Sequence, residues 1–280
     1  MNAFTVSPGA YAGPGLSWLN THLHGLFAAI AGFFDALIDG LVAILGLAPA
    51  PVVIGILSLI VLKISGWRYG LICVACLAVC LLFDMWTSTI ETLALVLVSV
   101  LFSVIVGVPL GVLAWRKPAL RTAIRPCLDI MQTLPPWVYL VPAVILFGLG
   151  TVPAILSTII YGIAPMTRLT ILAMSQIPLD RIELGHATGA SKLDILRKIE
   201  LPSALPTLVI GLNQCILLSL AMMVLAGLVG AGGLGSEVTQ GLTRMDFGLG
   251  LRASLAIVAL AIAMDRVCRG AIPQKYLATH

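Results

Sequence analysis

The chain has 280 residues, of which 60% are hydrophobic and 10% are charged, and its mean hydropathy is +1.09. Soluble domains carry about 25% charged residues, so this composition indicates a membrane protein and excludes an ordinary soluble domain. The net charge of +4 comes from basic residues dispersed among separate loops, which is not typical of a nucleic-acid-binding surface.

Residues 1–48 are predicted to form an external tail that contains one amphipathic helix. Residues 1–62 hold no Lys or Arg, which excludes a secretory signal with a basic first region. Residues 1–17 are rich in Gly, Pro and Ala and are expected to be irregular. From 26 to 45, apolar residues recur at helical spacing, and Asp35 and Asp39 share the other face. Two carboxylates one turn apart favour a helix in the membrane interface over one that crosses the bilayer.

Residues 49–270 are predicted to form an all-α transmembrane bundle of about seven spans. The apolar runs lie near residues 50–64, 67–83, 88–115, 136–149, 151–177, 204–229 and 249–267. Basic residues collect in alternate loops, near 63–68, 116–125 and 181–198 and after 266. The positive-inside rule therefore predicts an external N-terminus and a cytoplasmic C-terminus, with residues 271–280 as a cytoplasmic tail.

The third predicted span carries a small residue at every fourth position: Ser99, Ser103, Gly107 and Gly111. A stripe of small side chains lets another helix approach closely. This face is therefore expected to pack against protein rather than lipid.

Several polar or aromatic residues in the predicted spans are candidates for a translocation pathway. The sequence MQTLPPWVYLVP, residues 131–142, places Gln132, Thr133, Trp137 and Tyr139 beside three prolines. The aromatic faces suit a cation in a pathway, but an interfacial aromatic belt beside a bent helix explains them equally well. The other candidates are Asn213, Gln214 and Met222, for which helix–helix hydrogen bonds or core packing are the alternatives. An arginine within a span is a functional candidate by default, but Arg168 lies near the end of its span, which favours a structural role.

The charged segment 178–203 separates two long apolar runs and is predicted to hold two short helices at the membrane surface. Pro178 and Pro202 are expected to stop the flanking helices, and Gly189 to supply a bend between the short ones. Ser191 can cap the second helix, with Asp194 as an imperfect capping-box partner. In that helix Leu193, Leu196 and Ile199 form one apolar stripe, which predicts a docking surface.

Within this segment, Glu183 is followed six residues later by Gly189 and then by Ile199-x-Leu201-Pro202. This spacing resembles the coupling loop of the permease subunits of binding-protein-dependent ABC importers. In that family the loop inserts into a cleft on a separate ATPase subunit. The usual small pair after the glutamate is Leu184-Gly185 here, so the first half of the motif is degenerate. The resemblance implies a coupling role for Glu183, Ala187, Gly189, Ala190, Ser191, Leu193, Leu196, Ile199, Leu201 and Pro202.

Four further stretches point to one branch of this permease family. MQTLPPWVYLVP, LFGLGTVP, the RLT at 168–170 and AIAMDR at 261–266 are similar to the proline/glycine betaine/choline branch of these permeases. Together the resemblance covers about Leu45 to Arg269. It implies a small osmoprotectant such as glycine betaine, choline or proline as solute. Because similar permeases carry amino acids such as histidine, that alternative stays open.

Motifs that the sequence lacks exclude several kinds of mechanism. No Gly-Lys pair occurs, so the chain has no Walker A loop and is not expected to hydrolyse ATP itself. The sequence from Gly230 to Gly235 matches G-x-G-x-x-G, but it lacks the preceding strand and the later acidic residue of a dinucleotide site. An external turn or gate hinge is predicted there. Neither a catalytic residue nor a metal site is predicted, because Cys73-x-x-Cys76 lacks a second pair of ligands.

The resemblance implies a multi-pass protein of the bacterial cytoplasmic membrane that binds no cofactor. The expected partners are two copies of an ATPase that bind ATP and Mg, a second copy of this chain, and an extracytoplasmic solute-binding protein. An ATP-independent secondary transporter is the more remote alternative, because ionisable residues in the spans are scarce.

Overall fold

The computed structural model describes residues 8–270, and every regular element in this range is helical, so the predicted all-α fold is confirmed. In chain order the elements are α1 (Pro8–Gly46), α2 (Ala50–Ser65), α3 (Trp67–Leu82), α4 (Trp86–Arg116), α5 (Pro118–Thr133), α6 (Trp137–Phe147), α7 (Thr151–Ser175), α8 (Leu179–Ala187), α9 (Lys192–Ile195), the π-helical segment η1 (Leu196–Glu200), α10 (Leu201–Ala226), the 3-10 turn η2 (Gly227–Val229), α11 (Gly233–Thr243) and α12 (Phe247–Gly270).

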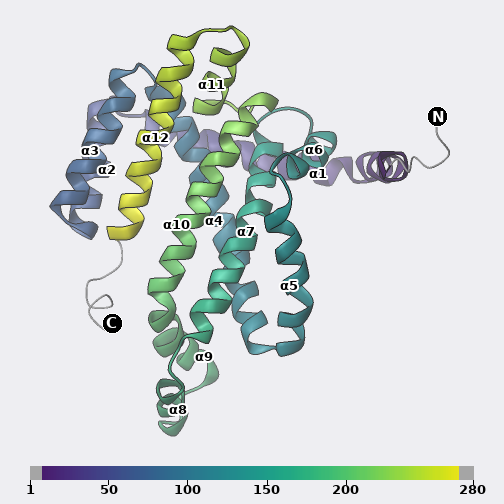
Figure 1. The fold of residues 1–280 in the computed structure, drawn as a ribbon, viewed down its shortest axis with the longest axis vertical. Coiled ribbons are helices and arrows are strands. Elements are labelled where there is room, and N and C mark those ends of the chain that lie inside the picture. Colours follow the sequence, from purple (N-terminus) through teal and green to yellow (C-terminus); the bar gives the residue numbers. More distant parts are fainter. Residues whose placement is uncertain (1–7, 271–280) are drawn as a thin grey trace.

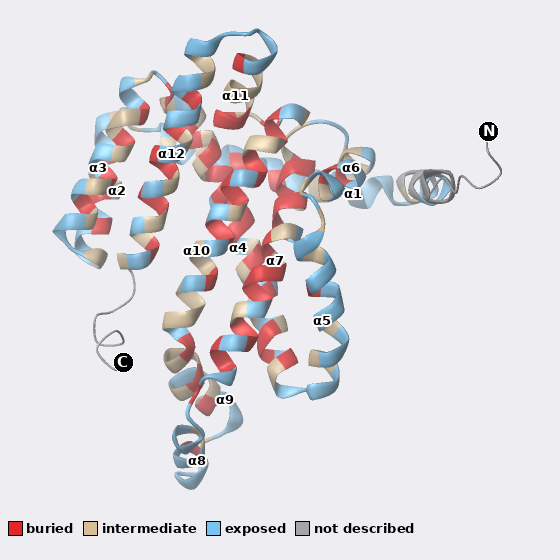
Figure 2. Ribbon diagram, viewed as in Figure 1, coloured by how far each residue is buried: buried red, intermediate tan, exposed pale blue. Residues whose placement is uncertain are grey.

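Three long helices, α4, α7 and α10, lie side by side in the centre of the fold (Figure 1). On one side α5 packs along α4 and α7, and on the other α12 packs against α10, with α3 and then α2 outside it. Helices α8 and α9 project from one end of the bundle, and α11 covers the opposite end (Figure 1). Buried residues gather where the central helices face one another, whereas α5 and α8 are largely exposed (Figure 2).

The predicted small-residue stripe on α4 packs against α7, as expected. The Ser103 hydroxyl donates a hydrogen bond to the Ile159 carbonyl at 3.0 Å. A Cβ atom at Gly107 would lie 2.9 Å from Cβ of Met166, and one at Gly111 would lie 2.5 Å from Cβ of Thr170. The two backbones can approach this closely only because these side chains are small or absent.

Within residues 8–270, five helices are long and apolar enough to cross a membrane: residues 21–46 of α1, α4, α7, the continuous helix 192–229, and α12. The predictions of spans at 88–115, 151–177 and 249–267 therefore correspond to α4, α7 and α12. The predicted spans 50–64 and 67–83 are helical, but α2 and α3 have 16 residues each. Each is only ~24 Å long, below the ~30 Å of a bilayer core. The chain reverses direction at Gly66, so α2 and α3 form a helical hairpin. Because a hairpin begins and ends on the same side, it does not change the predicted direction of the later spans.

The predicted span at 136–149 is helical as α6, but α6 has only 11 residues and is long enough to cross a membrane only together with α5. The chain runs along the bundle as α5, which was expected to be a loop, and then bends by 93° into α6. Pro135 and Pro136 lie at the bend, where the missing N–H groups interrupt the helix. Helix α5 is amphipathic: Leu120, Ile124 and Leu128 face the bundle while the other face stays polar. Its average hydropathy is therefore low, so it does not stand out in the sequence as an apolar run.

Helix α1 begins at Pro8 and kinks at Leu23. Residues 8–17 are therefore helical, whereas the sequence predicts them to be irregular. Residues 1–7 lie outside the described range. The helix runs across the bundle rather than along the central helices (Figure 1). Its Phe34 is buried and stacks edge-on against Phe102 of α4, with ring centroids 5.1 Å apart. Asp35 and Asp39 are exposed. This orientation fits the predicted interfacial helix, although residues 21–46 are long enough to span.

The G-x-G-x-x-G stretch, Gly230–Gly235, runs into the first turn of α11, a helix that the sequence does not predict. The N-terminus of α11 is already capped from α4, because the Gly233 amide donates to Glu91 Oε2 and the Leu234 amide to Thr92 Oγ1, both at 2.8 Å. A Cβ atom at Gly235 would lie 2.3 Å from the Met223 carbonyl oxygen. These glycines therefore serve a tight return of the chain onto α10 and α4, not a phosphate.

Candidate functional site

Residues 178–203, which we call the coupling segment, link α7 to α10 at the projecting end of the bundle (Figure 1). The two predicted helices are present as α8 and α9. The bend between them is at Gly189, whose φ is +73°. The Gly189 amide donates to the His186 carbonyl and the Ala190 amide to the Gly185 carbonyl. This pair of bonds is a Schellman motif, which requires a left-handed residue at position 189 and so favours glycine.

The second helix begins as expected. Ser191 Oγ accepts a hydrogen bond from the Asp194 amide at 3.2 Å and donates one to the Asp194 carboxylate at 2.5 Å. Asp194 also forms a 3.0 Å ion pair with Lys198 one turn later. The cap fixes the entry into α9 immediately after the glycine turn.

Pro202 does not stop this helix, contrary to the prediction. The chain stays helical from Lys192 to Val229, because Leu196–Glu200 widen into a π-helical segment. There the Leu201 amide bonds to the Leu196 carbonyl, five residues back. Proline has no backbone N–H to donate, and the i to i+5 bonding of a π segment lets the helix continue past it. The coupling segment is therefore continuous with α10 rather than hinged to it.

The predicted apolar stripe divides between two environments. Leu196 packs with Ile182 against the core between α4, α7 and α10, and Ile199 contacts α8. Leu193 is 54% exposed, whereas Ile195, absent from the predicted stripe, is 2% exposed. The continuous docking stripe is therefore wrong, because the widened turn changes which residues share a face.

Helix α8 rests on α9 through Gly185. A Cβ atom there would lie 2.7 Å from Cδ1 of Ile199 and 3.1 Å from Cγ1 of Ile195. Leu184, the larger residue of the degenerate pair, points away and is 66% exposed. Only the second position of the pair therefore needs a small residue in this geometry.

The outer face of the coupling segment combines apolar and charged side chains. Leu179, Leu184 and Leu193 are 73%, 66% and 54% exposed. Glu183 and Ala187 are also exposed, and Glu183 has no hydrogen bond or ion pair to any described residue. Exposed leucines beside an unpaired carboxylate are typical of a protein-docking surface.

The pathway candidates before α7 gather at the α5–α6 bend. Gln132 and Thr133 are exposed at the end of α5, and Trp137 is 42% exposed at the start of α6. The Tyr139 hydroxyl donates to the Met131 carbonyl across the bend, and its ring lies 5.7 Å from that of Tyr161 on α7. Tyr139 thus stabilises the bend, while Trp137 and Gln132 remain exposed.

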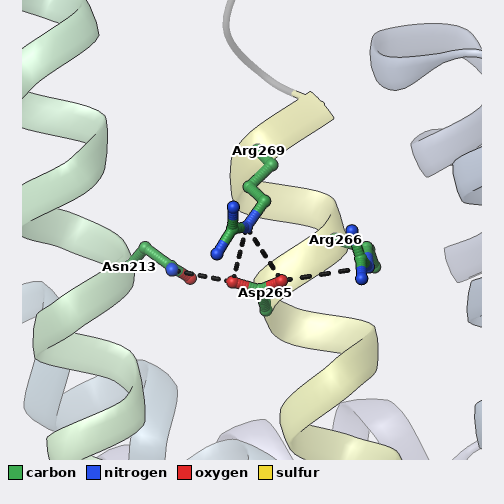
Figure 3. A network of polar contacts seen from close by, with 4 residues as sticks. All are labelled: Asn213, Asp265, Arg266 and Arg269. Carbon is green, nitrogen blue, oxygen red and sulfur yellow. Dashed lines mark hydrogen bonds and ion pairs between the residues drawn. The ribbon is translucent and has the colours of Figure 1, made fainter.

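Asn213 forms a helix–helix hydrogen bond, the alternative to a pathway role. Its amide donates to Asp265 on α12 at 2.8 Å (Figure 3). The same carboxylate accepts two bonds from Arg269, at 2.9 and 3.0 Å, and Arg266 lies 3.9 Å away (Figure 3). This cluster joins α10 to α12, and the sequence alone could not have paired residues 52 positions apart.

The remaining candidate residues differ in burial and in hydrogen bonding. Met222 is fully buried, which agrees with core packing, the alternative to a pathway role. Gln214 is exposed and makes no hydrogen bond within the described residues, so it remains a candidate. Arg168 pairs with Asp129 of α5, which agrees with the favoured structural role.

Sequence comparisons agree with this geometry. Residues 103–268 match the family described as binding-protein-dependent transport system inner membrane component. The glycine betaine/proline betaine transport system permease protein ProW of Escherichia coli (strain K12) is 42% identical over 253 residues, which cover 90% of this chain and 72% of the relative. The glycine betaine transport system permease protein OpuAB of Bacillus subtilis (strain 168) is 39% identical, with 90% and 89% covered.

A solved structure of the MetNI methionine ABC transporter, in an inward-facing conformation, contains a similar chain. That chain is 26% identical, with a TM-score of 0.57, over 65% of this chain and 93% of its own length. The apolar helices and the family match identify a multi-pass transport subunit of the inner membrane. This chain therefore belongs to the family of binding-protein-dependent transport system inner membrane components.

Proposed function

We propose that this chain is the transmembrane subunit of an ATP-driven importer and that its coupling segment docks on a separate ATPase. The observation that carries the proposal is that Leu179, Leu184 and Leu193 of the projecting segment are exposed, as is the unpaired Glu183. The Schellman turn, the Ser191 cap and the contact at Gly185 hold this face in a defined shape. A preorganised surface can transmit a push without first becoming ordered.

The complete importer would contain two copies of this chain, two ATPase subunits and an external solute-binding protein. Because the chain has no Gly-Lys pair, ATP and Mg would bind on the ATPase subunits. Closure of the ATPase pair would move both coupling segments and bias the bundle between two arrangements of its helices. Glu183, Ala187, Leu193 and Gly189 would form or shape the contact, while Ala190, Ser191, Leu196, Ile199, Leu201 and Pro202 hold its frame.

The coupling segment would face the cytoplasm, with an external N-terminus. Two contacts support this orientation by bringing basic segments together at one end of the fold. Arg116, at the end of α4, meets Glu200, and Gly270, at the end of α12, lies against Ser65 beside Lys63 and Arg68. The coupling segment carries its own basic residues at the same end. Grouped basic loops favour the cytoplasmic side.

The solute would be a quaternary ammonium osmoprotectant such as glycine betaine. The two relatives at 42% and 39% identity are named for glycine betaine transport. The alternative of an amino acid has weaker support, from the methionine transporter at 26% identity. A permanent cation suits the aromatic side chains near the α5–α6 bend.

Reconstitution with the cognate ATPase and binding protein tests both parts of the proposal. ATP hydrolysis would be measured with betaine, choline, carnitine, proline and histidine in turn. Stimulation by betaine or choline is the expected result. Stimulation by histidine alone would overturn the solute and keep the mechanism, whereas failure to form a complex with the ATPase would overturn the importer itself.

A further inference from the structure

Glu200 is the only charged residue that is buried among residues 8–270, and it has one ion-pair partner. Its Oε2 atom lies 3.0 Å from Nη2 of Arg116, and the two side chains are 5% and 35% exposed, respectively. A carboxylate removed from water is unfavourable unless a partner compensates it. Arg116 therefore keeps Glu200 in place, and the pair joins the end of α4 to a position 84 residues later.

The π-helical segment directs Glu200 toward α4. Glu200 is the last residue of that segment, which adds one residue to a helical turn and so rotates the following residues by about 100°. Ile195 and Ile199 both lie against Gly185 of α8. Glu200, which follows Ile199, instead faces Arg116. This stretch therefore contacts α8 through its isoleucines and α4 through Glu200.

The pair lies at the junction between the docking face and the central helices. A cleft of about 570 Å³ borders it, lined by Trp115, Ile182, His186, Lys192 and Ile195 together with Arg116 and Glu200. Within the described residues, no other ion pair joins the coupling segment to α4. Because α4 is packed tightly on α7 at Gly107 and Gly111, a pull on Arg116 would reach both helices.

We propose that Arg116 and Glu200 are positioning residues for energy coupling, which link movement of the coupling segment to α4. Neither residue belongs to the motif of the coupling segment. This inference rests on the proposed function. It requires that loss of the pair changes the number of ATP molecules hydrolysed per solute imported, because a purely structural role would lower hydrolysis and uptake together.

The test compares Glu200→Gln and Arg116→Gln with the unaltered chain in proteoliposomes that contain the whole importer. Both variants are expected to assemble with the ATPase and to hydrolyse ATP, while the number of ATP molecules hydrolysed per solute imported rises several-fold. Arg269→Gln is the matched control. It also removes an arginine–carboxylate pair, of 2.9 Å, but one within a single helix and far from the coupling segment. Its ratio should equal that of the unaltered chain.

Arg116→Gln strands a buried carboxylate and can fail to fold, so Glu200→Gln carries the decision. In that variant Arg116 remains partly exposed and can be hydrated. An unchanged ratio in assembled Glu200→Gln importer would overturn the inference while leaving the proposed function intact. No ATP-dependent uptake by the unaltered chain would instead overturn the proposed function. Recovery of the ratio in the exchanged pair, Arg116→Glu with Glu200→Arg, would support the inference.

Discussion

Gly185 packs directly against Ile199, so that a Cβ atom at position 185 would lie 2.7 Å from Cδ1 of Ile199. This contact holds α8 on the first turns of the helix that continues into α10. Gly185→Val should separate the two helices, because overpacking costs about 1–3 kcal/mol. Hydrogen–deuterium exchange should become faster in α8, and solute uptake should fall. Gly55→Val, at a site with nothing within 4 Å, is the control; equal exchange in α8 in both variants would contradict the contact.

Gly189 offers a separate test, because its φ of +73° is adopted easily by glycine and tolerated by Asn and Asp. Gly189→Asn should retain most uptake. Gly189→Asp has a similar backbone tolerance but adds a charge to the exposed turn, so it should insert and fold yet hydrolyse ATP without import. The measurement is ATP hydrolysed per solute imported. Normal uptake by Gly189→Asp would count against a role of this turn in coupling.

The α4–α7 contact predicts a stability effect. Gly111→Ala would place a methyl group 2.5 Å from Cβ of Thr170, so the free energy of unfolding should fall by about 1–3 kcal/mol. Thermal unfolding in detergent would measure it. A second change, Thr170→Gly, makes room for the methyl group and should recover part of the loss. Equal unfolding temperatures for the unaltered chain and Gly111→Ala would show that the helices can separate here without cost.

Asn213 and its neighbour Gln214 should behave differently. Asn213→Leu removes the hydrogen bond to Asp265, and such bonds between membrane helices contribute about 0.6–1.7 kcal/mol. The unfolding temperature should fall while the KM for the solute stays constant. Gln214→Leu should leave the unfolding temperature unchanged, because the Gln214 side chain is exposed. A raised KM in Asn213→Leu at unchanged stability would return Asn213 to the translocation pathway.

Local chemistry made much of the coupling segment predictable from sequence. A glycine between two short helices, a serine three residues before an aspartate and a proline before the first helix each constrain the backbone through neighbouring atoms. The bend at Gly189 and the cap at Ser191 are therefore present as predicted. The helix stop predicted at Pro202 is absent, because a π-helical turn of five residues carries the helix past the proline.

The membrane-crossing helices also divide into those that local sequence predicts and those that it does not. Uniformly apolar stretches such as α4, α7 and α12 are visible in the sequence because lipid or core surrounds every face. The sequence predicts a loop where α5 lies, because only one face of this helix is apolar and its polar face carries Arg121, Arg125 and Asp129. Whether such a helix joins a bundle depends on the surface offered by α4 and α7, which the residues of α5 do not encode.

The sequence by itself determined that this is a helical membrane protein, where its main apolar helices lie, and where the coupling segment turns, because composition and capping act over a few residues. Only the tertiary structure decided which distant side chains meet: Arg116 with Glu200, Asn213 with Asp265, and Glu91 with the start of α11. Those pairings depend on how whole helices pack, and packing follows from the shapes of both surfaces at once.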